Sequence, residues 1–249
     1  MASPLINPNN FEVNNEAQEL HETGLKEELN KNFQSADQSF DQALDILSYT
    51  TNSELSETDK NVQTARILRD KGFNLIRFSI QEQNNGLFSD GYEVLNKSDS
   101  KFDKASTSLT MYSEFLSNDE MKHFYKSISA EKGATISLMA RAITAREVAM
   151  EVKNKGHQAD RLYRKAHYYL TIGDNGYYRV SNAMVAARHE KIHSQNKKMI
   201  QWLSKAVVGL GFTILQDRKN LKPAVYTFGD RLIDLSSKSK AESSLKSKP

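Results

Sequence analysis

The spacing of apolar residues along the chain is that of α-helices. Ala36, Phe40 and Ala43 fall on one face of a helix, and no convincing run of alternating apolar and polar residues indicates a strand. Residues 9–222 contain no proline, the residue that helix interiors exclude. The same stretch is rich in alanine, leucine, lysine, glutamate and glutamine, which favour helix. We therefore predict an all-α protein.

Polar and glycine-containing breaks divide the chain into helices. Residues 96–100 are interpreted as a linker and residues 173–176 as a turn, and Gly133 could interrupt the longest helix. The predicted helices span residues 15–30, 33–48, 59–83, 87–95, 104–116, 119–153, 158–171, 177–194, 197–208 and 222–235. We predict an N-terminal arm over 1–14, a helical-repeat domain over 15–235 and a disordered basic tail over 236–249.

The first two predicted helices carry Leu20, Gly24, Ala36, Phe40 and Ala43. Small residues at these steps let two antiparallel helices approach closely, and the aromatic residue fills the space toward the next pair. This pattern resembles the tetratricopeptide repeat, in which a large residue, a small residue and a small–large–small trio recur at the same spacing.

Later segments resemble the repeat in degenerate form. The trio recurs at Ala159, Tyr163 and Ala166. In the second unit it falls on 84, 88 and 91, where an asparagine departs from the pattern. The resemblance implies a right-handed α-solenoid of stacked helical hairpins. An irregular, non-repeating helical bundle is the alternative fold.

The resemblance also implies a function, because the first helices of successive tetratricopeptide hairpins line a concave groove that holds a peptide or a partner helix. The positions that would face this groove and bind a partner are Arg66, Arg69, Phe73, Arg77, Arg141, Arg188 and Lys191. Arginine offers planar, bidentate donors to carboxylates. We therefore expect a non-catalytic adaptor or scaffold, with no cofactor, that binds acidic or C-terminal peptide segments of a protein partner.

The charge distribution suggests another role for these arginines than binding a partner. Residues 1–60 hold twelve acidic and three basic residues, residues 61–235 carry a net charge of +9, and the tail over 236–249 carries +3. The basic residues could pair with the acidic N-terminal helices, within one chain or between copies in a homo-oligomer, or lie in solvent. The folded part lacks the strong basic excess of a dedicated nucleic-acid-binding protein, so we do not expect nucleic acid as the partner.

Two histidine motifs indicate a metal-dependent enzyme as the second functional alternative. His189, Glu190 and His193 form an HExxH pattern similar to the zincin metalloprotease signature, with Glu190 as general base. The third zinc ligand would be Asp217, Asp230 or Asp234, or a residue upstream.

The same histidines also suggest a ferritin-like di-iron site. Glu120 with His123 and Glu190 with His193 are two ExxH motifs of the kind found in such bundles. The further glutamates would be Glu27 or Glu28 and Glu147 or Glu151.

Several classes are excluded by what the sequence lacks. The chain has no cysteine, so disulfides, thiolate nucleophiles and iron–sulfur clusters are excluded. The longest apolar run, 206–215, is too short to span a bilayer. The first residues lack the basic start and apolar core of a secretory signal, so we expect a cytoplasmic protein.

Overall fold

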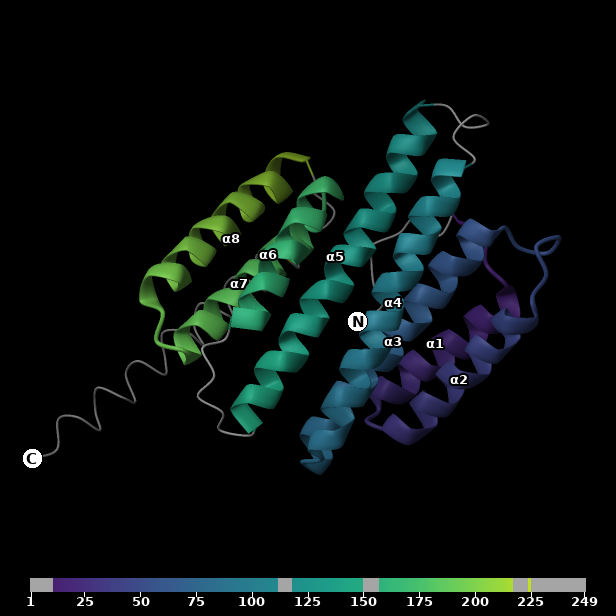
Figure 1. Ribbon diagram of the computed structural model, residues 1–249, viewed down its shortest axis with the longest axis horizontal. Coiled ribbons are helices and arrows are strands. Elements are labelled where there is room, and N and C mark those ends of the chain that lie inside the picture. The colour runs from purple at the N-terminus through teal and green to yellow at the C-terminus, as the bar shows by residue number, and fades with distance from the viewer. Residues whose placement is uncertain (1–10, 112–117, 150–156, 217–223, 225–249) are drawn as a thin grey trace, which may run out of the picture.

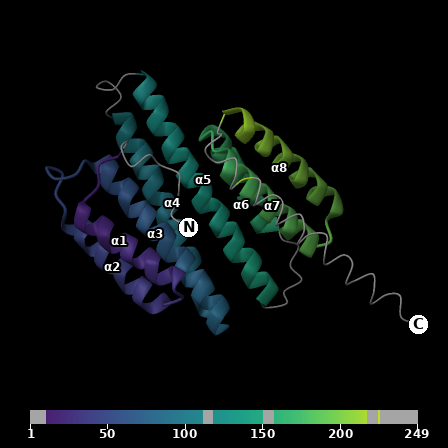
Figure 2. The same ribbon diagram turned by 180° about the vertical axis from the view of Figure 1, so that it is seen from behind.

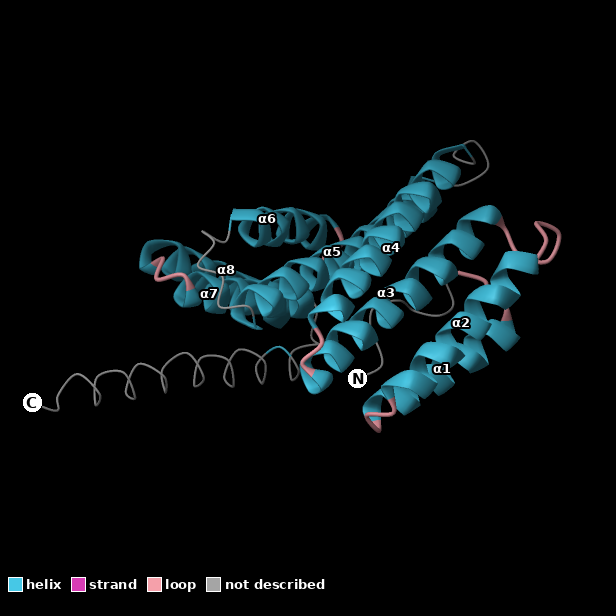
Figure 3. Cartoon of the chain, turned by 60° about the horizontal axis from the view of Figure 1, so that its bottom comes forward, coloured by secondary structure: helices cyan, strands magenta, loops and turns pink. Residues whose placement is uncertain are grey.

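The computed structural model describes residues 11–111, 118–149, 157–216 and 224. These residues form eight helices and no strand, which confirms the predicted all-α class (Figure 3). The helices are α1 (Asn15–Leu29), α2 (Phe33–Tyr49), α3 (Glu57–Glu82), α4 (Asn85–Met111), α5 (Asn118–Ala149), α6 (His157–Ile172), α7 (Gly176–Ile192) and α8 (Asn196–Gln216). Among them, none combines the length and apolar character that a bilayer span requires.

Side-chain caps begin three of these helices where the sequence places polar residues. Asn14 accepts a hydrogen bond from the backbone N–H of Ala17, and Ser56 accepts one from the N–H of Asp59. Asn175 accepts one from the N–H of Tyr178 and so begins α7 after the turn at 173–175. Each cap satisfies an amide that has no partner inside the helix.

The helices follow one another across the molecule in chain order, from α1 and α2 at one end to α8 at the other (Figures 1 and 2). The closest partners are α1 with α2, α3 with α4, α5 with α6 and α7 with α8, which makes four helical hairpins of the described helices. Each hairpin then packs against the next through helices adjacent in sequence. Packing between chain neighbours explains why several small apolar clusters replace one central core.

The second helix of each of the first three hairpins carries the same buried face. Along each helix, this face consists of a small residue, an aromatic residue, a second small residue and a leucine. The successive steps between them are four, three and four positions. The members are Ala36, Phe40, Ala43 and Leu47 in α2; Ser98, Phe102, Ala105 and Leu109 in α4; and Ala159, Tyr163, Ala166 and Leu170 in α6. All are at most 4% exposed, and the three sets begin 62 and 61 residues apart.

The last hairpin departs from this order. In α8 the buried positions at the same steps are Trp202, Ala206, Gly209 and Thr213. The large residue therefore comes first and small residues follow.

The predicted break within the second hairpin is wrong. Residues 96–100, interpreted as a linker, lie in the middle of the continuous helix α4. Its polar residues find partners in neighbouring helices: the Ser98 hydroxyl donates to the carbonyl of Ala65 in α3 at 2.7 Å, and Asp99 lies 3.5 Å from the ammonium of Lys132 in α5. The buried trio consequently falls on Ser98, Phe102 and Ala105 rather than on residues 84, 88 and 91.

Several glycines mark close helix approaches, and glycines inside helices do not interrupt them. A Cβ added at Gly24 would lie 2.6 Å from the ring of Phe40, as the repeat-like spacing predicts. Gly133 lies inside α5, which runs through it without interruption and packs there against Leu170. Helix α8 likewise continues past Gly209 and Gly211 beyond its predicted end at 208.

One residue of the predicted N-terminal arm packs against the helices, and α1 begins at Asn15 as predicted. Phe11, assigned to the arm, is 4% exposed, and its ring centroid lies 5.1 Å from the ring centroid of Phe124 in α5. The predicted helix at 222–235 and the predicted tail at 236–249 fall outside the described residues, apart from residue 224.

Gly91 should not tolerate a side chain. Its added Cβ would lie 2.9 Å from the carbonyl oxygen of Gly72 and 2.9 Å from Cγ1 of Ile76, so Gly91→Ala must separate α3 from α4. We expect it to lower the free energy of unfolding by about 1–3 kcal/mol in urea denaturation. Gly211→Ala is the control, because nothing lies within 4 Å of that Cβ and alanine should stabilise α8 by about 0.5–1 kcal/mol. Equal stability of the two variants would contradict the close approach.

Candidate functional site

The first helices of the four hairpins form one continuous side of the array. Helices α1 and α3, α3 and α5, and α5 and α7 contact each other directly, whereas contacts between consecutive even-numbered helices are sparser. We call the side formed by α1, α3, α5 and α7 the odd-helix face. It carries the residues that the sequence predicts as partner-binding and the HExxH histidines.

A buried ion-pair network crosses the odd-helix face. Arg69 of α3 hydrogen-bonds to Glu131 of α5 and lies 2.9 Å from the Oδ1 of Asp70. Asp70 also accepts a hydrogen bond from Nε2 of His21 in α1 at 2.9 Å, and Arg66 lies 3.5 Å from Glu131. We call these five residues the Arg69 network, and they join three of the four odd helices.

The charges in this network stabilise one another. Burial favours the neutral form of Asp70, but the charge of Arg69 and the hydrogen bond from His21 outweigh it and lower the pKa of Asp70. Burial acts against the Arg69 charge in the same way, and the carboxylates of Asp70 and Glu131 outweigh it and raise the pKa of Arg69. Both groups are therefore held charged inside the protein.

Next to the network, three predicted partner-binding residues lie together. The guanidinium carbon of Arg141 in α5 is 5.5 Å from the ring centroid of Phe73 in α3, and that of Arg77 is 6.0 Å from the same centroid. Arg77 also donates to Glu28 of α1 at 2.8 Å. Burial raises the pKa of Glu28, although the bond to Arg77 opposes that shift. We call Phe73, Arg77 and Arg141 the Arg–Phe cluster.

The remaining predicted residues have different environments. Arg69 is 4% exposed, so a partner cannot reach it without opening the network, and Arg66 is also largely covered. Arg188 and Lys191 are half-buried on α7. The expected pairing of the acidic front with the basic middle occurs within one chain, at Arg77 with Glu28 and at Lys71 with Asp41.

The HExxH histidines lie close to a carboxylate upstream in the sequence, which the zincin resemblance allowed as third ligand without naming it. Glu147 of α5 joins His189 and His193 of α7, and one ligand atom of each lies within 4.8 Å of the others. Oε2 of Glu147 is 3.1 Å from Nε2 of His193, and the two imidazole centroids are 4.6 Å apart. The sequence contained this carboxylate only as a di-iron candidate, because the spacing within one helix says nothing of which residue of a distant helix faces it.

Glu190 turns toward another helix. Its carboxyl group hydrogen-bonds to Asp160 of α6, and Lys198 of α8 is 3.4 Å from the same aspartate. Burial, followed by the charge of Asp160, raises the pKa of Glu190 to about 7. Burial opposes ionisation of Asp160 too, but Arg164 and Lys198 lower its pKa. Glu190, the predicted general base, thus takes part in a contact between two hairpins.

The two ExxH motifs do not converge. His123 is exposed on α5 and lies 24 residues before Glu147, a separation of about 36 Å along the helix. Glu120 lies on α5 three residues before His123, at the same end of the helix. The structure therefore does not bring the two motifs together at one site. The candidate zinc ligands Asp217, Asp230 and Asp234 lie outside the described residues.

Comparison with known proteins adds no assignment to this geometry. No protein-family model matches the sequence, and no curated protein matches it.

Removal of one carboxylate from the Arg69 network should strongly destabilise the fold. Glu131→Leu leaves the Arg69 guanidinium buried with one acidic partner fewer, so we expect a loss of about 3 kcal/mol in the free energy of unfolding. Asp41→Ala, which removes a 56% exposed partner of Lys71, should cost less than about 1 kcal/mol. Urea denaturation followed by circular dichroism measures both, and similar midpoints would contradict a structural role of the network.

Glu190 should make the folded state less stable as pH rises. Its pKa moves from 4.5 to about 7 on folding, so the folded protein binds more protons than the unfolded chain in that window. The contribution of Glu190 to stability is therefore fully present below pH 4.5 and is lost as pH rises through about 7. Glu190→Gln stays neutral and should gain about 1 kcal/mol over the natural protein at pH 8. Glu19→Gln, an exposed change, should leave the pH profile of denaturant midpoints unaltered, and an unaltered profile in both variants would refute the assignment.

Proposed function

We propose that the protein is a non-catalytic scaffold whose odd-helix face binds an acidic segment of a protein partner. The observation that carries the proposal is the Arg–Phe cluster, in which side chains of two different hairpins meet. Arginine and aromatic residues are enriched where proteins bind each other, because they combine a large contact area with directed hydrogen bonds.

The cluster is suited to a carboxylate-rich segment. Two guanidinium groups flank one ring, and the Arg77 side chain remains 32% exposed although it pairs with Glu28. A partner carboxylate can compete with Glu28 for Arg77 without opening the Arg69 network. The ring of Phe73 offers apolar contact beside it.

The architecture that we propose for this scaffold is a right-handed, tetratricopeptide-like α-solenoid in the cytoplasm. Support comes from the buried small–aromatic–small–leucine face that recurs in α2, α4 and α6. Stacked hairpins of this kind offer extended surfaces for partners. The metal-dependent hydrolase has less support, because Glu190 is bonded to Asp160.

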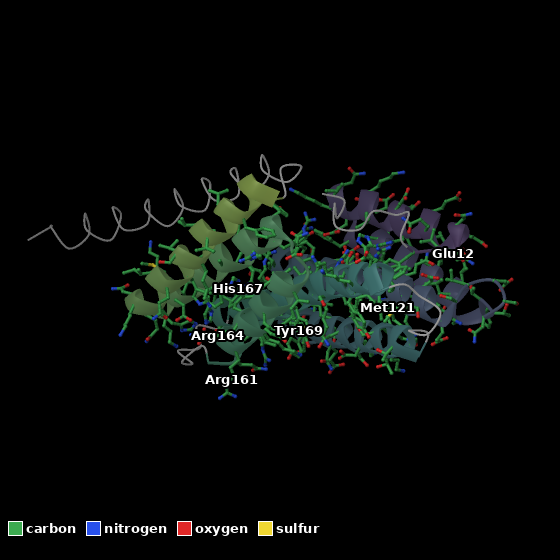
Figure 4. The ribbon with its side chains drawn as sticks, turned by 90° about the horizontal axis from the view of Figure 1, so that it is seen from above. Glu12, Met121, Arg161, Arg164, His167 and Tyr169 are labelled. Carbon is green, nitrogen blue, oxygen red and sulfur yellow. The ribbon has the colours of Figure 1, made fainter. Side chains whose placement is uncertain are left out.

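A charge reversal within the cluster tests the proposal. Arg141→Glu should weaken binding of a fluorescent aspartate- and glutamate-rich peptide by about tenfold or more in anisotropy titrations, because it puts a like charge into the face. The matched control is Arg161→Glu on α6, an exposed arginine of an even-numbered helix (Figure 4), which should change the affinity less than about twofold.

The same titration separates specific from general charge effects. Phe73→Ala keeps the net charge and should still weaken binding, and higher salt should weaken binding to the natural protein. Equal losses in Arg141→Glu and Arg161→Glu, or no binding of acidic peptide over a neutral scrambled one, would overturn the proposal. Circular dichroism verifies that each variant is folded.

A further inference from the structure

We propose that Glu147, His189 and His193 form a binding site for one zinc ion. The site is independent of the Arg–Phe cluster, and the scaffold function does not require it. Two imidazoles and one carboxylate are a ligand set that zinc accepts, with a water molecule in the fourth position. The chain has no cysteine, so any zinc site in it must use nitrogen and oxygen ligands of this kind.

Hydrogen bonding holds His189 in the tautomer that can coordinate a metal. The Thr144 hydroxyl donates to the carbonyl of Ala140 at 2.9 Å, so at 3.0 Å from Nδ1 of His189 its oxygen acts as acceptor. Nδ1 therefore carries the proton and Nε2 carries the lone pair. Metal-ligating histidines typically donate their second ring nitrogen to such an oxygen, which fixes the ring orientation.

The spacing of the three residues suits a small cation. Ligand atoms around tetrahedral zinc lie about 3.3 Å apart, given metal–nitrogen bonds of about 2.0 Å. One ligand atom of each residue lies within 4.8 Å of the other two, so side-chain rotations that shorten each separation by at most about 1.5 Å would give the tetrahedral spacing. His189 and His193 are four residues apart on one face of α7, and Glu147 faces them from α5.

Access from solvent and the polarity of α7 both favour a cation here. His189 is 1% exposed, whereas the side chains of His193 and Glu147 are each 12% exposed, so the site lies at the edge of the protein where an ion can enter. His189 is in the last turn of α7 and His193 is its C-cap. The C-terminal end of a helix carries a partial negative charge that attracts cations.

Isothermal titration with zinc chloride, on protein prepared without a histidine tag, tests the site. We expect one zinc ion per chain and a rise in melting temperature on zinc addition. Cobalt(II) in the same site should give the absorption bands of tetrahedral coordination. Magnesium should not compete, because it prefers oxygen ligands in octahedral geometry.

Four variants locate the ion. Glu147→Gln and His193→Ala each remove a ligand and should weaken zinc binding by more than about tenfold. Thr144→Val leaves all ligands in place but removes the hydrogen-bond acceptor for Nδ1 of His189, and it should weaken zinc binding by about tenfold. His123→Ala is the control, since this exposed histidine lies on the same helix as Glu147 but far from the site.

The outcomes are distinct. Absence of zinc binding to the natural protein overturns the proposal, as does unchanged affinity in both ligand variants or an equal loss in His123→Ala. Circular dichroism of each variant without metal verifies the fold, and His193→Ala, at the end of α7, serves if Glu147→Gln does not fold. Peptide binding by the Arg–Phe cluster is unaffected by these outcomes.

Discussion

The close contact between the two helices of each hairpin is the constraint on which the rest of the structure depends. It requires small side chains at the crossing points, because a helix axis can approach another only where no Cβ or a short side chain intervenes. Gly72 and Gly91 bring the backbones of α3 and α4 together, and Gly24 receives the ring of Phe40. Large buried residues between these points fill the remaining space. The hairpins then stack in chain order and expose their first helices on one side.

The odd-helix face also contains buried charged and polar residues. The Arg69 network places several charges out of water between α1, α3 and α5, and such groups persist only when each has partners. Asp160 of α6 is paired with Arg164 and Lys198 in the same way, whereas burial and the charge of Asp160 raise the pKa of Glu190 in α7 to about 7. Paired buried charges determine which residues of neighbouring hairpins face each other. Apolar contacts alone determine this less specifically.

Both proposed sites lie at the edge of these buried polar residues, where side chains reach solvent. The Arg–Phe cluster lies where guanidinium groups remain reachable from solvent, and the zinc site lies at the end of α7, where two imidazoles meet Glu147. In each case the residues come from consecutive odd helices, so stacking of the hairpins determines both sites. A change that separated α3 from α5, or α5 from α7, would disperse one of them.

The sequence by itself determined the all-helical class, most helix positions and the hairpin spacing of 15–48, because these depend on local propensity, capping and periodicity. It predicted the break after α3, where Gln83 adopts a left-handed conformation. Only tertiary structure decided that the polar run 96–100 continues α4, since Ser98 donates to a backbone carbonyl of α3 and Asp99 forms an ion pair with Lys132 of α5. It likewise decided that Glu147 joins His189 and His193 while Glu190 turns to Asp160, because the spacing within one helix selects a face but cannot select which distant residue packs against it.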